Sequence, residues 1–75
     1  MNKINDIDEI DYLIDLFEEY KEFLTQTQKQ AFYLYFYENL SYQEIANITA
    51  TTRSAAYDSV KKAIINLKKI ASKIT

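Results

Sequence analysis

The chain is 75 residues long and contains neither glycine nor proline. The tight turns of β-hairpins and the corners of sheets depend on residues that tolerate positive φ or lack an N–H group, and these two residue types fill many such positions. A chain without them is best suited to helices joined by short polar turns. Apolar residues make up 48% of the sequence and charged residues 27%, as in an ordinary globular domain, so the composition predicts a single all-α domain over residues 1–75.

Cysteine and histidine are absent as well. Their absence excludes zinc and iron–sulfur centres, disulfides, haem ligation and Cys or His nucleophiles. EF-hand loops and phosphate-binding loops need glycine, so calcium-sensor and nucleotide sites are excluded too. A metal held by carboxylates alone remains open, but paired acids such as Asp11 and Asp15 share one solvated helical face. We therefore predict no cofactor, no metal site, no small-molecule substrate and no catalysis.

No apolar run approaches the roughly 20 residues that a membrane-spanning helix needs, and no basic-then-apolar leader opens the sequence. The expected location is the cytoplasm. A domain of this size buries only about 60% of its unfolded surface, so pairing with a second copy would add stability.

The net charge of −2 hides a strong split along the chain. Residues 1–24 contain eight acids and two lysines, a net charge of −6, and residues 25–50 have a net charge of −1. Residues 51–75 contain six basic residues and one aspartate, a net charge of +5. A basic segment of this kind indicates that the protein binds nucleic acid. The alternative explanation of the charge split is that an acidic helix and a basic helix pack side by side. Exposed charges have little effect on stability, so such a split needs no binding partner.

Apolar periodicity and capping patterns predict four helices, over residues 7–23, 26–38, 42–48 and 53–74. The predicted N-caps are Asp6 (with Glu9), Thr25 (with Gln28), Ser41 (with Glu44) and Thr52. Thr27 with Gln30 is an alternative capping box for the second helix. Asn39 is the best candidate for a left-handed residue that ends that helix in place of glycine.

Two apolar strips follow the first predicted helix and together cover an arc of roughly 220°. This arc is wider than one neighbouring helix usually needs. It indicates either a helix wrapped by the rest of a small core or a dimer or partner surface made by Tyr12, Leu16 and Phe23.

The second helix is aromatic on every side. Phe32, Tyr35 and Phe36 share a face and are predicted core residues, whereas Tyr33 and Tyr37 should lie nearer the outside. Outer tyrosines of this kind either pack half-buried with a wet hydroxyl or stack on unpaired bases.

The fourth helix has a single apolar arc about 120° wide. We expect its first half to pack on the second and third helices and its second half to cover the first. Arg53, Tyr57, Lys61 and Lys68 form a polar stripe beside that arc.

The middle of the chain resembles the helix-turn-helix of sigma-factor C-terminal domains and, more closely, the small YlxM family of bacterial proteins. The matching segments are Leu24-Thr25 with Gln28, Leu34-Tyr35-Phe36, Leu40-Ser41-Tyr42, Glu44-Ile45-Ala46, Thr52-Arg53, Ala55 and Tyr57-Asp58. The resemblance implies a regulatory or accessory protein with the fold of a DNA-binding regulator. It also implies a link to the signal recognition particle, whose RNA and GTPase are proposed partners of the family.

The turn between the third and fourth helices departs from the family pattern. Ala50 stands where glycine or asparagine is usual, and an alanine in a left-handed turn costs roughly 1 kcal/mol. Thr49 and Thr51 replace apolar residues, which thins the packing between the two helices. Ser54 replaces a common glutamine, so one long base-reading side chain is lost.

If the motif binds duplex DNA, nine residues form the predicted interface: Ser41, Tyr42, Gln43, Thr52, Arg53, Ser54, Tyr57, Lys61 and Lys62. The first three lie at the backbone, the next four face the major groove, and the two lysines meet phosphates. A sequence pI near 5.0 opposes tight binding to a polyanion. The rival hypothesis is therefore a protein-interaction or dimerisation module in which the helix-turn-helix no longer reads DNA.

Overall fold

The computed structural model describes residues 7–74. These residues form four α-helices and one short 3₁₀-helix, so the predicted all-α fold is confirmed. The elements are α1 (Ile7–Tyr20), η1 (Lys21–Phe23), α2 (Gln26–Phe36), α3 (Tyr42–Thr49) and α4 (Arg53–Ile74). The predicted cap at Asp6 lies outside the described residues. Within residues 7–74, none of the helices is long and apolar enough to cross a membrane.

Side-chain caps begin the three later helices, as predicted. Thr25 and Gln28 form a reciprocal capping box at α2, which decides between the two alternatives for that helix. Ser41 and Glu44 form a second box at α3. At α4 the Thr52 hydroxyl accepts a hydrogen bond from the Ala55 amide over 3.0 Å. Each cap satisfies N–H groups that the first helical turn would leave unpaired.

Two helices end earlier than the sequence pattern indicates. The first α-helix stops at Tyr20, and residues 21–23 tighten into η1 before Leu24 becomes extended. The second stops at Phe36, two residues short of the expected end. Asn39 adopts the predicted left-handed conformation, with φ of 59°, and lets the chain turn toward α3.

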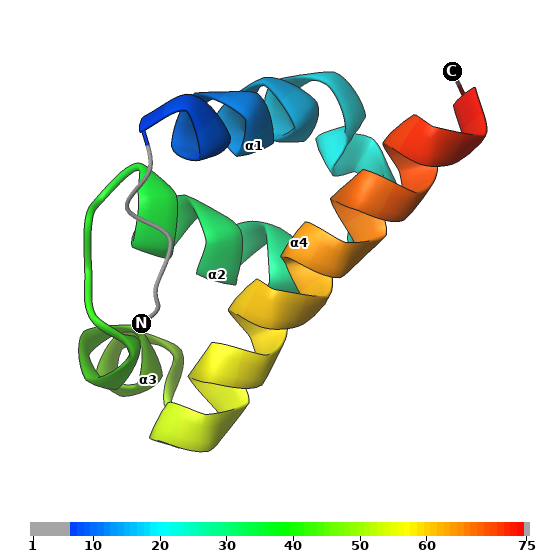
Figure 1. Ribbon diagram of the computed structural model, residues 1–75. Coiled ribbons are helices and arrows are strands. Elements are labelled where there is room, and N and C mark those ends of the chain that lie inside the picture. The colour runs from blue at the N-terminus through cyan, green and yellow to red at the C-terminus, as the bar shows by residue number, and fades with distance from the viewer. Residues whose placement is uncertain (1–6, 75) are drawn as a thin grey trace.

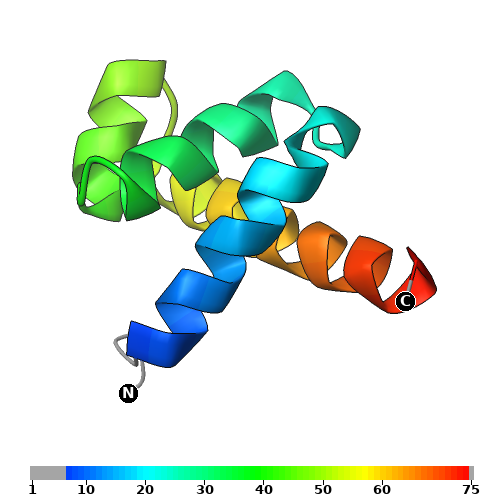
Figure 2. The same ribbon diagram turned by 90° about the horizontal axis from the view of Figure 1, so that it is seen from above.

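The longest helix, α4, packs on all three of the other α-helices (Figure 1). Seen from above, α1 crosses over α4 (Figure 2). The first half of α4 closes a cluster with α2 and α3 through Ala31, Ile45, Ala46, Ala56 and Val60. The second half closes a cluster with α1 and α2 through Leu13, Leu16, Phe17, Leu24, Phe32, Ala63, Leu67 and Ala71. The predicted division of α4 into two packing halves is therefore confirmed.

Leu16 corrects one of the sequence-based predictions. We grouped it with Tyr12 and Phe23 on a dimer or partner surface, but Leu16 is only 9% exposed and belongs to the α1–α4 cluster. Tyr12 and Phe23 are 48% and 67% exposed. The apolar arc of α1 is wide because the helix packs against both α2 and α4, and Leu16 belongs to this core.

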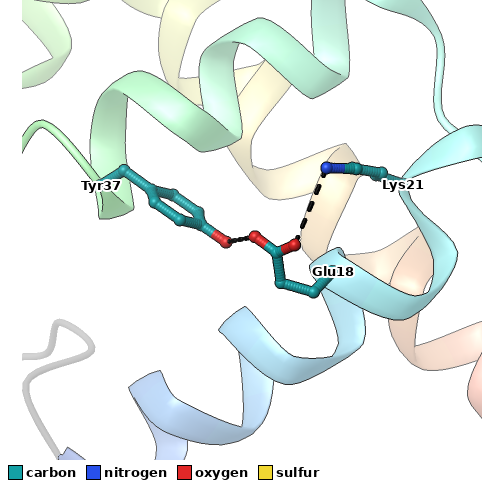
Figure 3. A network of polar contacts seen from close by, with 3 residues as sticks. All are labelled: Glu18, Lys21 and Tyr37. Atoms are coloured by element: carbon teal, nitrogen blue, oxygen red, sulfur yellow. Dashed lines mark hydrogen bonds and ion pairs between the residues drawn. The ribbon is translucent and has the colours of Figure 1, made fainter.

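A polar contact ties α1 to the end of α2 (Figure 3). The Tyr37 hydroxyl donates a hydrogen bond to Glu18 Oε2, and Lys21 Nζ lies 3.7 Å from Glu18 Oε1. Beneath this contact, the rings of Phe17 and Phe32 stack with centroids 4.5 Å apart. The outer surface of the α1–α2 pair is thus held by charge-assisted hydrogen bonding and its inner surface by aromatic packing.

Candidate nucleic-acid interface

The turn between α3 and α4 sets the direction in which α4 leaves the motif. Ala50 is left-handed there, with φ of 58° and ψ of 44°. The Thr51 amide donates back to the Ala46 carbonyl over 2.9 Å, and the Thr49 hydroxyl donates to the Ile45 carbonyl over 2.8 Å. These bonds tie the turn back to the Ile45 and Ala46 carbonyls of α3, and they hold the end of the helix despite the steric cost of a Cβ at residue 50.

A small cavity of about 110 Å³ lies behind this turn, between α2, α3 and α4. Its lining includes Thr49 and Thr51, the two residues that replace apolar side chains of the family pattern. Unfilled volume therefore lies next to both threonines. The remaining lining residues are Thr27, Gln30, Ala31, Ile45, Ala56 and Ser59.

Four of the nine predicted interface residues line one open hollow of about 350 Å³ at the start of the motif's two helices. We call it the aromatic hollow, and its lining residues are Tyr42, Arg53, Ser54 and Tyr57. Tyr42 is the first residue of α3, and the other three occupy the first turns of α4. The caps at Ser41 and Thr52 start the two helices at the positions that bring these side chains together.

Aromatic contacts hold the wall of the hollow in place. The ring of Tyr42 lies flat on Tyr35 of α2, with centroids 4.9 Å apart and an angle of 3° between the planes. Tyr42 and Tyr57 meet at 86° with centroids 5.2 Å apart. Burial of the Tyr42 hydroxyl, followed by the adjoining hydroxyl of Tyr35, raises the pKa of Tyr42 well above its ordinary value. The Tyr42 hydroxyl therefore keeps its proton at a pH at which an ordinary tyrosine would ionise.

The lysines of α4 differ in what they contact. Lys61 Nζ lies 5.9 Å from the centroid of the Tyr57 ring, beside the hollow. Lys62 pairs with Asp58 over 3.2 Å on the exposed side of the helix. Lys68 pairs with Glu9 of α1 over 3.1 Å. Of the lysines in the predicted polar stripe of α4, Lys61 thus lies beside the hollow, whereas Lys68 joins α4 to α1.

Besides Lys61 and Lys62, three of the predicted residues lie outside the hollow. Ser41 and Thr52 are exposed, but their hydroxyls serve as helix caps. Gln43 donates from Nε2 to Asn47 Oδ1 over 3.1 Å along the surface of α3. The structure therefore gathers Tyr42, Arg53, Ser54 and Tyr57 with Lys61 nearby and leaves the other predicted residues at the periphery.

Tyr35 is the residue that sequence reasoning assigned incompletely. Its predicted place on the inner face of α2 is correct in part, because the side chain is half-buried. Its flat contact with Tyr42 makes it the support of the hollow. The seven-residue separation of the two tyrosines across a turn carries no periodic signal, so no sequence pattern pairs them.

The outer tyrosines of α2 stack on each other. Tyr33 and Tyr37 have ring centroids 4.8 Å apart, and they are 44% and 37% exposed. Burial, and then the hydrogen bond to Glu18, raises the pKa of Tyr37. These two rings face α1 and the solvent rather than the aromatic hollow, which matches the predicted outer placement.

Comparison with known proteins identifies relatives of the chain. A family model described as "Putative helix-turn-helix protein, YlxM / p13 like" matches residues 7–75. A UPF0122 protein of Mycoplasma mycoides is 50% identical over 50 residues, which are 67% of this chain and 44% of that protein. A Clostridium novyi UPF0122 protein is 45% identical over 47 residues, or 63% of this chain and 41% of that protein.

A longer alignment, with a Clostridium botulinum UPF0122 protein, is 36% identical over 66 residues, 88% of this chain and 58% of the relative. The chain spans less than half the length of the Mycoplasma and C. novyi relatives that it matches. No solved structure matches the chain. Because the family model covers all but the first six residues, the chain belongs to the UPF0122 family of YlxM / p13-like helix-turn-helix proteins.

Proposed function

We propose that this protein is a non-catalytic, nucleic-acid-binding regulatory or accessory protein of the cytoplasm. The observation that carries the proposal is the aromatic hollow, in which a guanidinium, a hydroxyl and two tyrosine rings from the two helices of the motif converge. Membership of a helix-turn-helix family supports the same role. None of the four lining residues is acidic, so the hollow suits an anionic polymer.

The charge distribution indicates which side of the protein a nucleic acid would approach. The exposed acids of α1 and η1 include Asp8, Asp11, Asp15, Glu18, Glu19 and Glu22. The exposed basic residues of α4 are Arg53, Lys61, Lys62, Lys68, Lys69 and Lys73. A polyanion is therefore repelled from α1 and attracted to α4, where Arg53 lines the hollow and Lys61 lies beside it. In the second half of the helix, Lys68 is paired with Glu9 of α1.

Within this role, the resemblance to the YlxM family favours the signal recognition particle as the system served. Its RNA is the favoured nucleic acid and its GTPase the favoured protein partner, with promoter-like duplex DNA as the alternative ligand. The acidic overall balance, with a pI near 5.0, supports a ligand that needs few phosphate contacts.

Mobility shifts with particle RNA and with duplex DNA, at low and moderate salt, test the proposal. Arg53→Ala should weaken binding about tenfold, because a forked contact to a base contributes roughly 1–3 kcal/mol. Lys69→Ala is the matched control, since Lys69 is exposed on the far half of the same helix. Absence of binding both to particle RNA and to duplex DNA would falsify the nucleic-acid-binding role.

A second candidate function is a protein-interaction module, supported by the exposure of Phe23. This side chain is 67% exposed and contacts the ring of Tyr20, in an acidic part of the surface. Sedimentation of the parent and of Phe23→Ser tests it. A complex or dimer that Phe23→Ser dissociates supports the module, and a monomer that never associates with the GTPase counts against it.

A further inference from the structure

We propose that the aromatic hollow takes one unpaired nucleobase, together with its adjoining phosphate, from a single-stranded segment or loop. This inference rests on the proposed function and names the class of nucleic acid that the site prefers. The shared chemistry is a flat, unstacked base on a sugar–phosphate chain, which either RNA or single-stranded DNA can supply.

The walls of the hollow match the two kinds of surface that a base presents. Tyr42 and Tyr57 stand at 86° to each other, so a flat ring that stacks on one tyrosine directs its edge toward the other. Tyr57 is 46% exposed and lines a volume of about 350 Å³. Stacking of an aromatic side chain on an unpaired base is a common and sequence-tolerant contribution to binding.

Hydrogen-bonding groups lie where the edge of such a base would be read. Arg53 offers a planar fork of N–H donors, and Ser54 offers a hydroxyl that can donate or accept. A guanidinium fork fits the O6 and N7 acceptors of guanine. Guanine is therefore the base that we expect the hollow to prefer.

One cationic side chain lies next to the ring of Tyr57. Lys61 Nζ lies 5.9 Å from the centroid of Tyr57, so a base stacked at this ring brings its phosphate within reach of the ammonium group. The neighbouring Lys62 is paired with Asp58, and the net charge of the chain is −2. Few phosphates are neutralised in this arrangement, so the affinity should depend only weakly on salt.

A fully paired duplex should bind to this site more weakly than an unpaired base does. In a duplex both faces of every base are covered by its neighbours, so the Tyr57 ring has no base face to contact. The first turn of α4 would then contribute Arg53 at a groove edge and phosphate contacts that the acidic surface opposes. An unpaired base is accordingly favoured over a groove.

Fluorescence anisotropy with three labelled nucleic acids tests the inference. The probes are an RNA hairpin whose six-nucleotide loop contains one guanine, the DNA hairpin of the same sequence, and an RNA duplex in which the loop sequence is fully paired. At least one hairpin should bind about tenfold or more tightly than the duplex. Preference for the RNA or the DNA hairpin identifies the source of the base, and equal binding supports recognition of their shared chemistry.

Three variants link the preference to the hollow. Tyr57→Leu should weaken hairpin binding about tenfold, whereas Tyr57→Phe should retain it, because phenylalanine keeps the stacking face. Arg53→Lys keeps the charge but loses the fork, so it should abolish discrimination between loops with guanine and with adenine. Circular dichroism of each variant verifies that the helices remain folded.

The outcomes separate this inference from the proposed function. Equal binding of duplex and hairpins, or hairpin binding unchanged in folded Tyr57→Leu, would overturn the unpaired-base site while leaving a nucleic-acid-binding protein. Failure of every probe, together with particle RNA and duplex DNA, would overturn both.

Discussion

The ring of Tyr42 lies on the ring of Tyr35 with only 3° between their planes. This contact joins the start of α3 to the inner face of α2 and holds one wall of the aromatic hollow. Tyr35 does not line the hollow itself, so it acts as a positioning residue whose effect on a ligand passes through Tyr42.

Replacing Tyr35 should therefore weaken binding without removing a ligand contact. We expect Tyr35→Leu to lower affinity for a hairpin loop several-fold, and Tyr35→Phe to retain it, because phenylalanine preserves the stack. Anisotropy titrations check this, with helical content measured in parallel. Equal losses in the two variants would point to the hydroxyl instead of the stacked ring.

The left-handed alanine in the turn of the motif makes a stability prediction. Ala50→Gly should raise the free energy of unfolding by about 1 kcal/mol, because glycine has no Cβ to clash at φ of 58°. Ala55→Gly is the matched control. Ala55 is exposed within α4, where the same substitution should instead lower stability by about 0.5–1 kcal/mol. Urea denaturation measures both, and a loss of stability in Ala50→Gly would contradict the steric argument.

The contact between Tyr37 and Glu18 makes the domain sensitive to alkali. Burial and the Glu18 hydrogen bond raise the pKa of Tyr37 in the folded state above the ordinary tyrosine value of about 10. Above that pH the unfolded chain loses the Tyr37 proton while the folded chain keeps it, so the free energy of unfolding falls as pH rises. The contribution is fully present below pH 10.

Tyr37→Phe tests this dependence. The variant lacks the titrating hydroxyl, so its stability should fall less steeply between about pH 10 and pH 11 than that of the parent. Glu18→Gln, which removes the charge but not the side chain, should also reduce the slope. Urea denaturation at closely spaced pH values measures the slopes; identical slopes in all three proteins would exclude a contribution from this contact.

Two neighbouring apolar residues of α4 should differ sharply in their effect on stability. Leu67 is fully buried in the α1–α4 cluster, and Leu67→Ala should cost about 2–5 kcal/mol. Ile65 is 45% exposed, and Ile65→Ala should change stability by less than about 0.5 kcal/mol. Thermal and urea unfolding compare the pair, and a large loss in Ile65→Ala would show that this side chain lies in an interface.

The features that the sequence predicted well are local ones. The caps at Thr25, Ser41 and Thr52 and the left-handed Asn39 depend on residues within a few positions of each other, so their signals survive in one sequence. The inner face of α4 could be predicted equally well, because the apolar residues of this helix are confined to one arc.

The features that it missed depend on tertiary packing. Both strips of α1 are apolar, and only the docking of α2 and α4 decides that Leu16 is buried while Tyr12 is exposed. The four residues that line the hollow were predicted as part of a larger interface, but the hollow itself depends on how α3 and α4 pack, and its support from Tyr35 depends on how α2 packs on α3. Periodicity along a chain carries no information about such angles.

The two apolar clusters divide α4 into two parts that pack on different sets of helices. Ala56 and Val60 of α4 pack with α2 and α3 in the part of the helix that presents the hollow, whereas Ala63, Leu67 and Ala71 pack with α1 and α2. Substitutions in the distal part should thus alter how long the folded protein survives in the cell, while leaving its choice of ligand intact.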